Sequence, residues 1–201
     1  QMQYFRAPDK PLYEPGTQST VFNGTEFAFR KGVIPKSVTK PIKYYHNGEL
    51  LRSPPVDAGT YTAVVELPAS DPDYRAGIYE VSVYIQPLRI YVYPFGGEKK
   101  KGEPDPESAF DYFTDELVGG ETLVGDLYRF KGETYGNYPY SAGGFSAVNA
   151  MGQRVYNYHF VIAPGSPTFF INWNFRHYLP LDPFSRIDPV FDEVHFSDGS
   201  T

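Results

Sequence analysis

The stretch that decides the fold is Pro55-Val56-Asp57-Ala58-Gly59-Thr60-Tyr61-Thr62-Ala63-Val64-Val65-Glu66, where a turn leads directly into an alternating strand. Asp57 and Gly59 favour the turn, because an Asp side chain can accept hydrogen bonds from amides two residues on and Gly adopts positive φ without steric cost. From Tyr61 onward, alternate residues fall on opposite faces, apolar on one face and mixed on the other. This period of two predicts a half-buried antiparallel strand.

The same residues resemble a tyrosine corner, the feature of immunoglobulin-type sandwiches in which a Tyr hydroxyl bonds to backbone upstream. We therefore expect structural roles for Asp57, Gly59 and Tyr61. The second Cys of antibody-like domains would follow two residues after this Tyr, where the chain has Ala63. Because the chain has no Cys, disulfides, thiolate metal sites and Cys nucleophiles are excluded, and packing alone must hold a sandwich.

The composition predicts a turn-rich, all-β protein. The 201 residues include 19 Gly and 19 Pro, and 17% of them are aromatic, which does not suit a helical bundle. A net charge of −6 argues against a nucleic-acid partner. No apolar run is long enough for a transmembrane helix, so we expect no membrane insertion within this segment. The start Gln1-Met2-Gln3 lacks the pattern of a signal peptide, so we expect a mature chain or an excised piece.

The order of strands and turns predicts two modules. Asn23-Gly24 and Asn47-Gly48 are strong hairpin signals, and residues 77–85 form a long alternating stretch that ends at Gln86-Pro87. The pattern then restarts, and Gly136-Asn137-Tyr138 repeats the Gly-x-Tyr entry, which suggests a structural role for Gly136. We predict two tandem Ig-like β-sandwich modules, at residues 1–87 and 88–175.

Two parts of this organisation stay open. Residues 176–201 form a C-terminal tail or add an edge strand, with residues 190–196 as the candidate strand. Residues 109–113 are too short a run for periodicity to separate a strand from a helical turn. A helix there would make the second module β-grasp-like instead.

Several blocks resemble the MBG and YDG-type repeats of bacterial surface adhesins: Tyr44-Tyr45-His46-Asn47-Gly48, the stretch Pro54 to Tyr61, and Ser70-Asp71-Pro72-Asp73-Tyr74. Residues 102–106, 119–127, 136–138 and 156–160 resemble another branch of the same group. This resemblance implies all-β modules of an extracellular, wall-attached or secreted bacterial protein that act as a stalk or an adhesive segment. It implies no catalytic residues, and neighbouring modules of the same long chain would be partners.

Catalytic and metal sites find no support in the sequence. The four His residues are far apart and lack zinc-ligand spacing, so we expect no metal site, no cofactor and no enzyme activity. Asp71 and Asp73 have a spacing that Ca²⁺ can use, but Asp and Pro are also common turn residues, and the further ligands of a calcium loop are missing.

The surplus of aromatic residues suggests a binding surface. Rings with a polar tip bind the faces of sugars, so an aromatic platform for a host or environmental glycan or protein is the candidate site. Its candidate members are spread over the second half: Tyr138, Tyr140, Tyr156, Tyr158 and Trp173. A carbohydrate-binding module and an accessory domain of an extracellular enzyme are therefore alternatives to the adhesin stalk.

Overall fold

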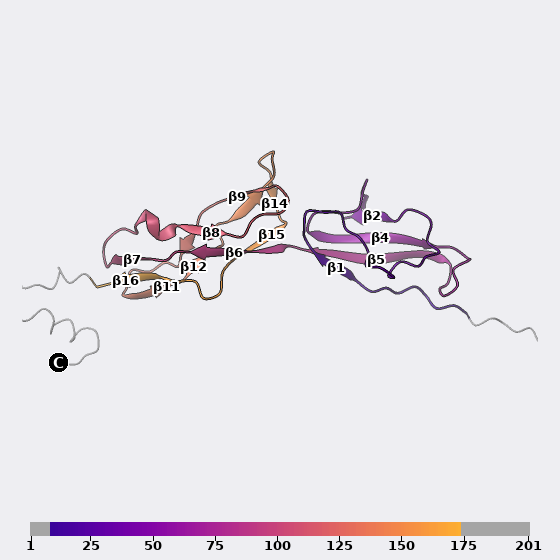
Figure 1. Cartoon of the computed structure of the whole chain (residues 1–201), viewed down its shortest axis with the longest axis horizontal. Coiled ribbons are helices and arrows are strands. Elements are labelled where there is room, and N and C mark those ends of the chain that lie inside the picture. Colours follow the sequence, from indigo (N-terminus) through magenta and orange to yellow (C-terminus); the bar gives the residue numbers. More distant parts are fainter. Residues whose placement is uncertain (1–8, 174–201) are drawn as a thin grey trace, which may run out of the picture. The chain divides into compact units, whose positions relative to one another are not determined.

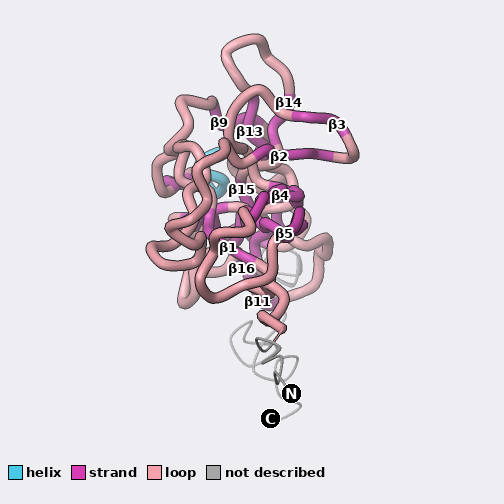
Figure 2. The backbone as a smooth tube through the Cα atoms, turned by 90° about the vertical axis from the view of Figure 1, so that its right-hand side faces the viewer, coloured by secondary structure: helices cyan, strands magenta, loops and turns pink. Residues whose placement is uncertain are grey.

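The computed structural model describes residues 9–173. The expected tail at 176–201, with its candidate edge strand, lies outside this range. Figures 1 and 2 show that the described chain is built from strands and long loops. Within residues 9–173 the one helical element is the 3₁₀ turn η1 (Glu107–Phe110), which is followed by β8 (Tyr112–Thr114). The all-β prediction is therefore confirmed, and residues 109–113 do not form the helix that a β-grasp arrangement would need.

Residue contacts divide the described chain into two compact units. Unit 1 comprises residues 9–90, 116–124 and 146–160, and unit 2 comprises residues 91–115, 125–145 and 161–173. The chain therefore passes between the units five times, after residues 90, 115, 124, 145 and 160. This division differs from the predicted single boundary after residue 87, because residues 116–124 and 146–160 pack with the first unit.

Unit 1 contains a five-stranded sheet in the order β1-β5-β4-β2-β3 (Figure 1). The central strand β4 carries the fold-deciding stretch, and Tyr61, Ala63 and Val65 are buried as predicted. The strand bounds are β1 (Gln18–Val21), β2 (Lys43–His46), β3 (Glu49–Leu50), β4 (Gly59–Leu67) and β5 (Gly77–Gln86). The predicted turn at Asn47-Gly48 joins β2 to β3, and both of its residues have positive φ (50° and 83°).

The core of unit 1 also includes a segment without strands. Phe22 and Phe27 are buried in the same cluster as Val65 and Val83. The Asn23-Gly24 turn is present, since Asn23 Oδ1 accepts a hydrogen bond from the amide of Thr25 (3.0 Å). Residues 26–29, which follow this turn, form no strand.

Unit 1 also holds the small sheet β14-β13-β9, formed by β9 (Thr122–Val124), β13 (Ser146–Val148) and β14 (Arg154–Val155).

Three small sheets have strands in unit 2, in the orders β15-β6-β8, β11-β16-β7 and β10-β12. β6 and β15 each continue from unit 1 into unit 2. Phe169 and Ile171 of β16 are fully buried and alternate with more exposed neighbours. The remaining bounds are β6 (Leu88–Pro94), β7 (Gly97–Lys100), β10 (Tyr128–Arg129), β11 (Gly136–Tyr138), β12 (Tyr140–Ser141), β15 (Tyr158–Ile162) and β16 (Phe169–Asn172).

The tyrosine corner forms as the sequence indicates. The Tyr61 hydroxyl donates to the Asp57 carbonyl oxygen four residues upstream (2.8 Å). The ring folds back over Gly59, where an added Cβ would lie 3.3 Å from the hydroxyl oxygen. The second Gly-x-Tyr forms the same hydrogen bond, since the Tyr138 hydroxyl donates to the Thr134 carbonyl oxygen (2.7 Å). Gly136 has a φ of +139°, and the Tyr138 ring does not lie over it.

A third corner was not foreseen. The Tyr79 hydroxyl donates to the Arg75 carbonyl oxygen (2.6 Å), again four residues upstream, and Gly77 stands two residues before the Tyr. The structure therefore uses Gly-x-Tyr at the entry of three strands, β4, β5 and β11. In each, the Tyr hydroxyl fixes the turn that precedes the strand.

Replacing Tyr61 with Phe removes the corner hydrogen bond and leaves the ring. We expect Tyr61→Phe to lower the free energy of unfolding by about 1 kcal/mol, the usual net contribution of one hydrogen bond. Urea unfolding measures this change. Tyr84→Phe on β5 is the matched control, because the Tyr84 side chain is 40% exposed, and it should leave the urea midpoint nearly unchanged. Equal midpoints for the two variants would show that the corner bond contributes nothing.

Candidate functional site

The five aromatic residues predicted as a platform do not form one. Tyr140 and Tyr158 are buried, with 5% and 9% of their surface exposed, so neither ring can stack on a ligand. Tyr138 uses its hydroxyl in a corner. Tyr156 is 71% exposed but belongs to unit 1, whereas Trp173 belongs to unit 2 and stacks on Tyr135 at 5.8 Å between ring centroids.

A different set of rings forms a contiguous surface in unit 2. Tyr91 and Tyr93 of β6, Phe95 just after it and Phe113 of β8 follow one another along the sheet. The centroid distances are 6.3 Å for Tyr91–Tyr93, 4.4 Å for Tyr93–Phe113 and 6.0 Å for Phe113–Phe95. Phe95 and Phe113 are 63% and 55% exposed. We call these four residues the aromatic strip.

The alternation of β6 explains why the strip faces outward. Ile90, Val92 and Pro94 are buried, so the odd-numbered side chains between them lie on the opposite face. In the antiparallel register, Tyr93 lies directly opposite Phe113. Their rings are nearly parallel, at 6°, and such a cross-strand aromatic pair stabilises the sheet.

A carboxylate supplies polar character at one end of the strip. Asp115 Oδ2 accepts a hydrogen bond from the Tyr91 amide (2.9 Å), and Asp115 Oδ1 accepts one from the Tyr93 hydroxyl (3.4 Å). Loss of hydration and the nearby Asp115 charge raise the pKa of Tyr93. The hydroxyl therefore stays protonated at neutral pH. The strip thus combines exposed ring surface with a phenol and a carboxylate, the two kinds of group that contact sugars.

The charged cluster of unit 2 has a structural arrangement. Asp105 receives two hydrogen bonds from Arg129, Nε to Oδ2 (2.6 Å) and Nη2 to Oδ1 (2.9 Å), and Lys99 Nζ lies 2.7 Å from Oδ1. Glu133 pairs with both cations, at 2.5 Å and 2.7 Å. The Arg129 guanidinium also lies over the ring of Phe169 (4.7 Å). These mutual contacts hold β7, β10 and the loops between them together.

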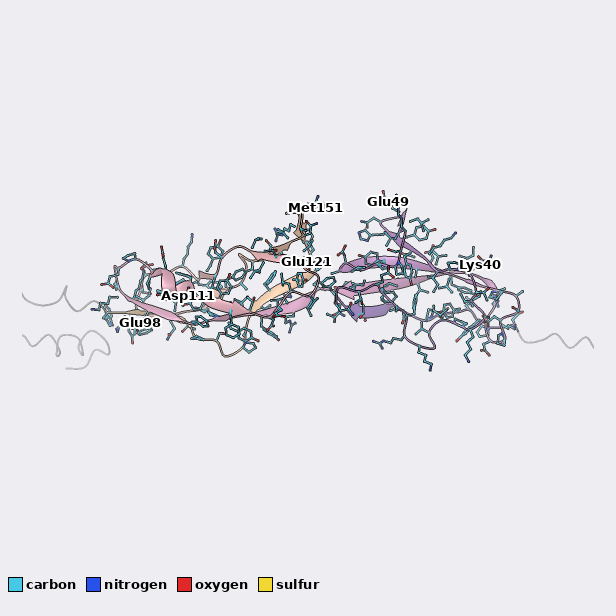
Figure 3. The ribbon with its side chains drawn as sticks, turned by 45° about the horizontal axis from the view of Figure 1, so that its top comes forward. Lys40, Glu49, Glu98, Asp111, Glu121 and Met151 are labelled. Atoms are coloured by element: carbon cyan, nitrogen blue, oxygen red, sulfur yellow. The ribbon has the colours of Figure 1, made fainter. Side chains whose placement is uncertain are left out.

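A second polar network holds residues of both sequence halves within unit 1. Asn157 is 2% exposed; its Nδ2 donates to Asp57 Oδ1 (2.9 Å) and its Oδ1 accepts from the Ala58 amide (2.8 Å). Next to it, the Tyr158 hydroxyl donates to Glu121 Oε2 (2.6 Å). Glu121, which is labelled in Figure 3, immediately precedes β9. Burial, followed by the hydrogen bond to Glu121, raises the pKa of Tyr158 to about 12.

The calcium candidate is explained by turn chemistry. Asp71 is buried, and its Oδ1 accepts hydrogen bonds from the amides of Asp73 (2.9 Å) and Tyr74 (2.6 Å) while Oδ2 accepts from Ser37. Within residues 9–173, no group of three or more His, Asp or Glu residues is placed to hold a metal ion. His177 and His195 lie outside the described residues.

Comparison with models of protein families and with curated proteins finds no match to this sequence. The resemblance to adhesin repeats therefore remains a prediction from the residues. In the described part of the chain, no helix has the length and apolar character needed to cross a bilayer.

Sequence reasoning missed the aromatic strip. The usable signal was the alternation of residues 89–95, which puts three aromatic residues on one face. The missing element was the pairing with Phe113, which lies 20 residues downstream of Tyr93 across a charged loop. Local periodicity does not specify such a register.

The charged cluster makes the stability of unit 2 depend on pH. The Arg129 hydrogen bonds, reinforced by Lys99, lower the pKa of Asp105 from 3.8 to about 2. Because the folded state favours the ionised carboxylate, its contribution is complete above the ordinary pKa. It is lost as the pH falls from about 4 through about 2.

We expect Asp105→Asn to lower the free energy of unfolding at neutral pH by about 2 kcal/mol. This is less than for a fully buried pair, because the Asp105 side chain keeps 24% of its surface exposed. The variant should also show a flatter loss of stability below about pH 4. Urea unfolding at several pH values tests both effects, with the exposed Asp111→Asn as control. An acid response identical to that of the unchanged chain would contradict the assignment.

Proposed function

We propose that this chain is a non-catalytic, adhesive β segment of a secreted or cell-surface bacterial protein, and that it binds carbohydrate through the aromatic strip. The single observation that carries the proposal is the contiguous run of four rings, Tyr91, Tyr93, Phe113 and Phe95, on the outer face of β6 and β8. The adhesin-repeat resemblance supports the setting. The exposed rings of the strip support a binding role that the resemblance does not assign to particular residues.

The chemistry of the strip favours a sugar over a purely apolar ligand. Sugars have one face of C–H groups, which packs on aromatic rings, and hydroxyls at the edges that need polar partners. Phe95 and Phe113 offer ring surface, while the Tyr93 hydroxyl and the Asp115 carboxylate lie beside the same rings. An extended strip of this kind suits a polysaccharide chain lying along the sheet.

The buried charges favour a role without catalysis. Lys99, Asp105 and Arg129 stabilise one another through ion pairs, and Asn157 and Tyr158 are used in hydrogen bonds that hold unit 1 together. Among the described residues, no buried side-chain nitrogen or oxygen lacks a hydrogen-bond partner. Each of these groups thus has a structural use within the fold.

A glycan array, followed by titration calorimetry with the best-binding polysaccharide, tests the proposal. We expect Phe113→Ala and Phe95→Ala each to weaken binding by about tenfold, since an exposed stacking contact contributes about 1 kcal/mol or slightly more. Tyr156→Ala is the matched control, because it removes an exposed ring from unit 1 outside the strip. Binding should then be unchanged. An array without hits, or equal losses for Tyr156→Ala and the strip variants, would refute carbohydrate binding at this site.

A further inference from the structure

The aromatic strip of unit 2 has a carboxylate at each end. Side chains alternate along β8, so those of Asp111 (labelled in Figure 3) and Asp115 lie on the same side as Phe113. Both acids also pair with β6 through the backbone. The Phe95 amide donates to the Asp111 carbonyl oxygen (3.0 Å). At the other end, the Asp115 amide donates to the Tyr91 carbonyl oxygen (3.1 Å).

The two carboxylates differ in how free they are to contact a ligand. Asp115 already accepts hydrogen bonds from a backbone amide and a Tyr hydroxyl of β6. The Asp111 side chain is exposed, and no group within residues 9–173 forms an ion pair or a hydrogen bond with its carboxylate. Phe95 and Phe113, the neighbouring rings, are 63% and 55% exposed. We call Asp111, Phe95 and Phe113 the acidic end of the strip.

The charge around the acidic end favours a cationic ligand. In unit 2, the sheet β15-β6-β8 contributes residues 91–94, 112–114 and 161–162, and none of these is Lys or Arg. Arg89, the nearest cation along β6, precedes Tyr91 and therefore stands at the opposite end of the strand from Phe95. An ammonium group beside Asp111 would gain from the carboxylate and from the electron-rich faces of the Phe rings. The net charge of −6 attracts cations in addition.

We propose that the acidic end recognises an amino sugar, so that the polysaccharide bound by the strip is one with free ammonium groups. This inference rests on the proposed carbohydrate binding and names the class of sugar. The C–H face of the sugar stacks on an exposed Phe ring, while its ammonium group donates to the Asp111 carboxylate. An N-acetylated sugar can stack in the same way, but it has no charge for Asp111. A Lys side chain has the charge, but it lacks the broad face that covers a ring.

Titration calorimetry with two oligosaccharides of one backbone tests the proposal. The ligands are a glucosamine hexamer, at a pH where its amines are protonated, and the matching N-acetylglucosamine hexamer. We expect the glucosamine hexamer to bind about threefold more tightly at low ionic strength, as one exposed ion pair would give. High salt should remove this difference, because salt screens exposed charges. Equal affinities of the two hexamers at low salt would overturn the proposal.

Substitutions assign the preference to the acidic end. Asp111→Asn should remove the advantage of the glucosamine hexamer and leave the affinity for the N-acetylated hexamer unchanged. Phe113→Ala should weaken the binding of both hexamers. Asp126→Asn is the matched control, because it removes an exposed carboxylate of unit 2 outside the strip and changes the net charge equally. If Asp126→Asn reduces the preference as much as Asp111→Asn, only net charge acts and the proposal is wrong.

The outcomes separate this inference from the proposed function. If both hexamers bind equally and both lose affinity with Phe113→Ala, amine recognition is wrong and carbohydrate binding at the strip stands. If no glycan binds, the proposed function fails together with the inference. Oligolysine of the same charge is the last comparison. If it displaces the glucosamine hexamer at equal concentration, the acidic end selects charge without a sugar, which would also overturn the proposal.

Discussion

The Asp57–Ala58 turn is the constraint on which unit 1 depends. The Asp57 carbonyl oxygen accepts from the Tyr61 hydroxyl, and its carboxylate and the following amide are both bonded to Asn157. The local bond between Tyr61 and Asp57 thus fixes the start of β4. The bond between Asn157 and Asp57, which are 100 residues apart, fixes the position of the Asn157 segment against this turn. Because Asn157 is almost completely buried, losing either partner would leave an unsatisfied polar group, which is costly in the interior. This explains why residues far along the chain belong to the first compact unit.

The absence of Cys gives these polar networks their importance. In a Cys-free chain, hydrogen bonds and ion pairs are what can tie distant segments together in addition to apolar packing. Unit 1 uses the Asn157 network, and unit 2 uses the Asp105–Arg129 pair with Lys99 and Glu133. The Arg129 side chain tolerates burial because its guanidinium donates hydrogen bonds to the carboxylates of Asp105 and Glu133 and lies over the ring of Phe169. The four charged side chains of this cluster in unit 2 thus pair with one another.

Features that depend on neighbouring residues could be predicted from the sequence, and those that depend on long-range pairing could not. The corner at Tyr61, the turn at Asn47-Gly48 and the buried face of β4 all follow from spacings within a few residues. The predicted aromatic platform does not form, because alternation alone does not show whether a Tyr in a strand faces the core or the solvent. Tyr140 and Tyr158 alternate in the same way as Tyr93, yet both are buried. Only the packing of other segments decides this difference.

The tyrosine corners and the aromatic strip use their rings in different ways. In each corner the Tyr hydroxyl is committed to a backbone carbonyl oxygen, and the rings of Tyr61 and Tyr79 also lie against the Gly two residues before them. Such a Tyr stabilises a turn and offers little to a ligand. Tyr93 lacks the Gly two residues before it and extends from the strand toward Phe113. A Gly two residues before a Tyr thus marks the corner residues, but its absence does not decide exposure, since Tyr140 and Tyr158 lack it and are buried. In this chain, Gly-x-Tyr identifies three Tyr residues that hold turns, and exposed rings such as Phe95 and Phe113 are the ones to test for binding.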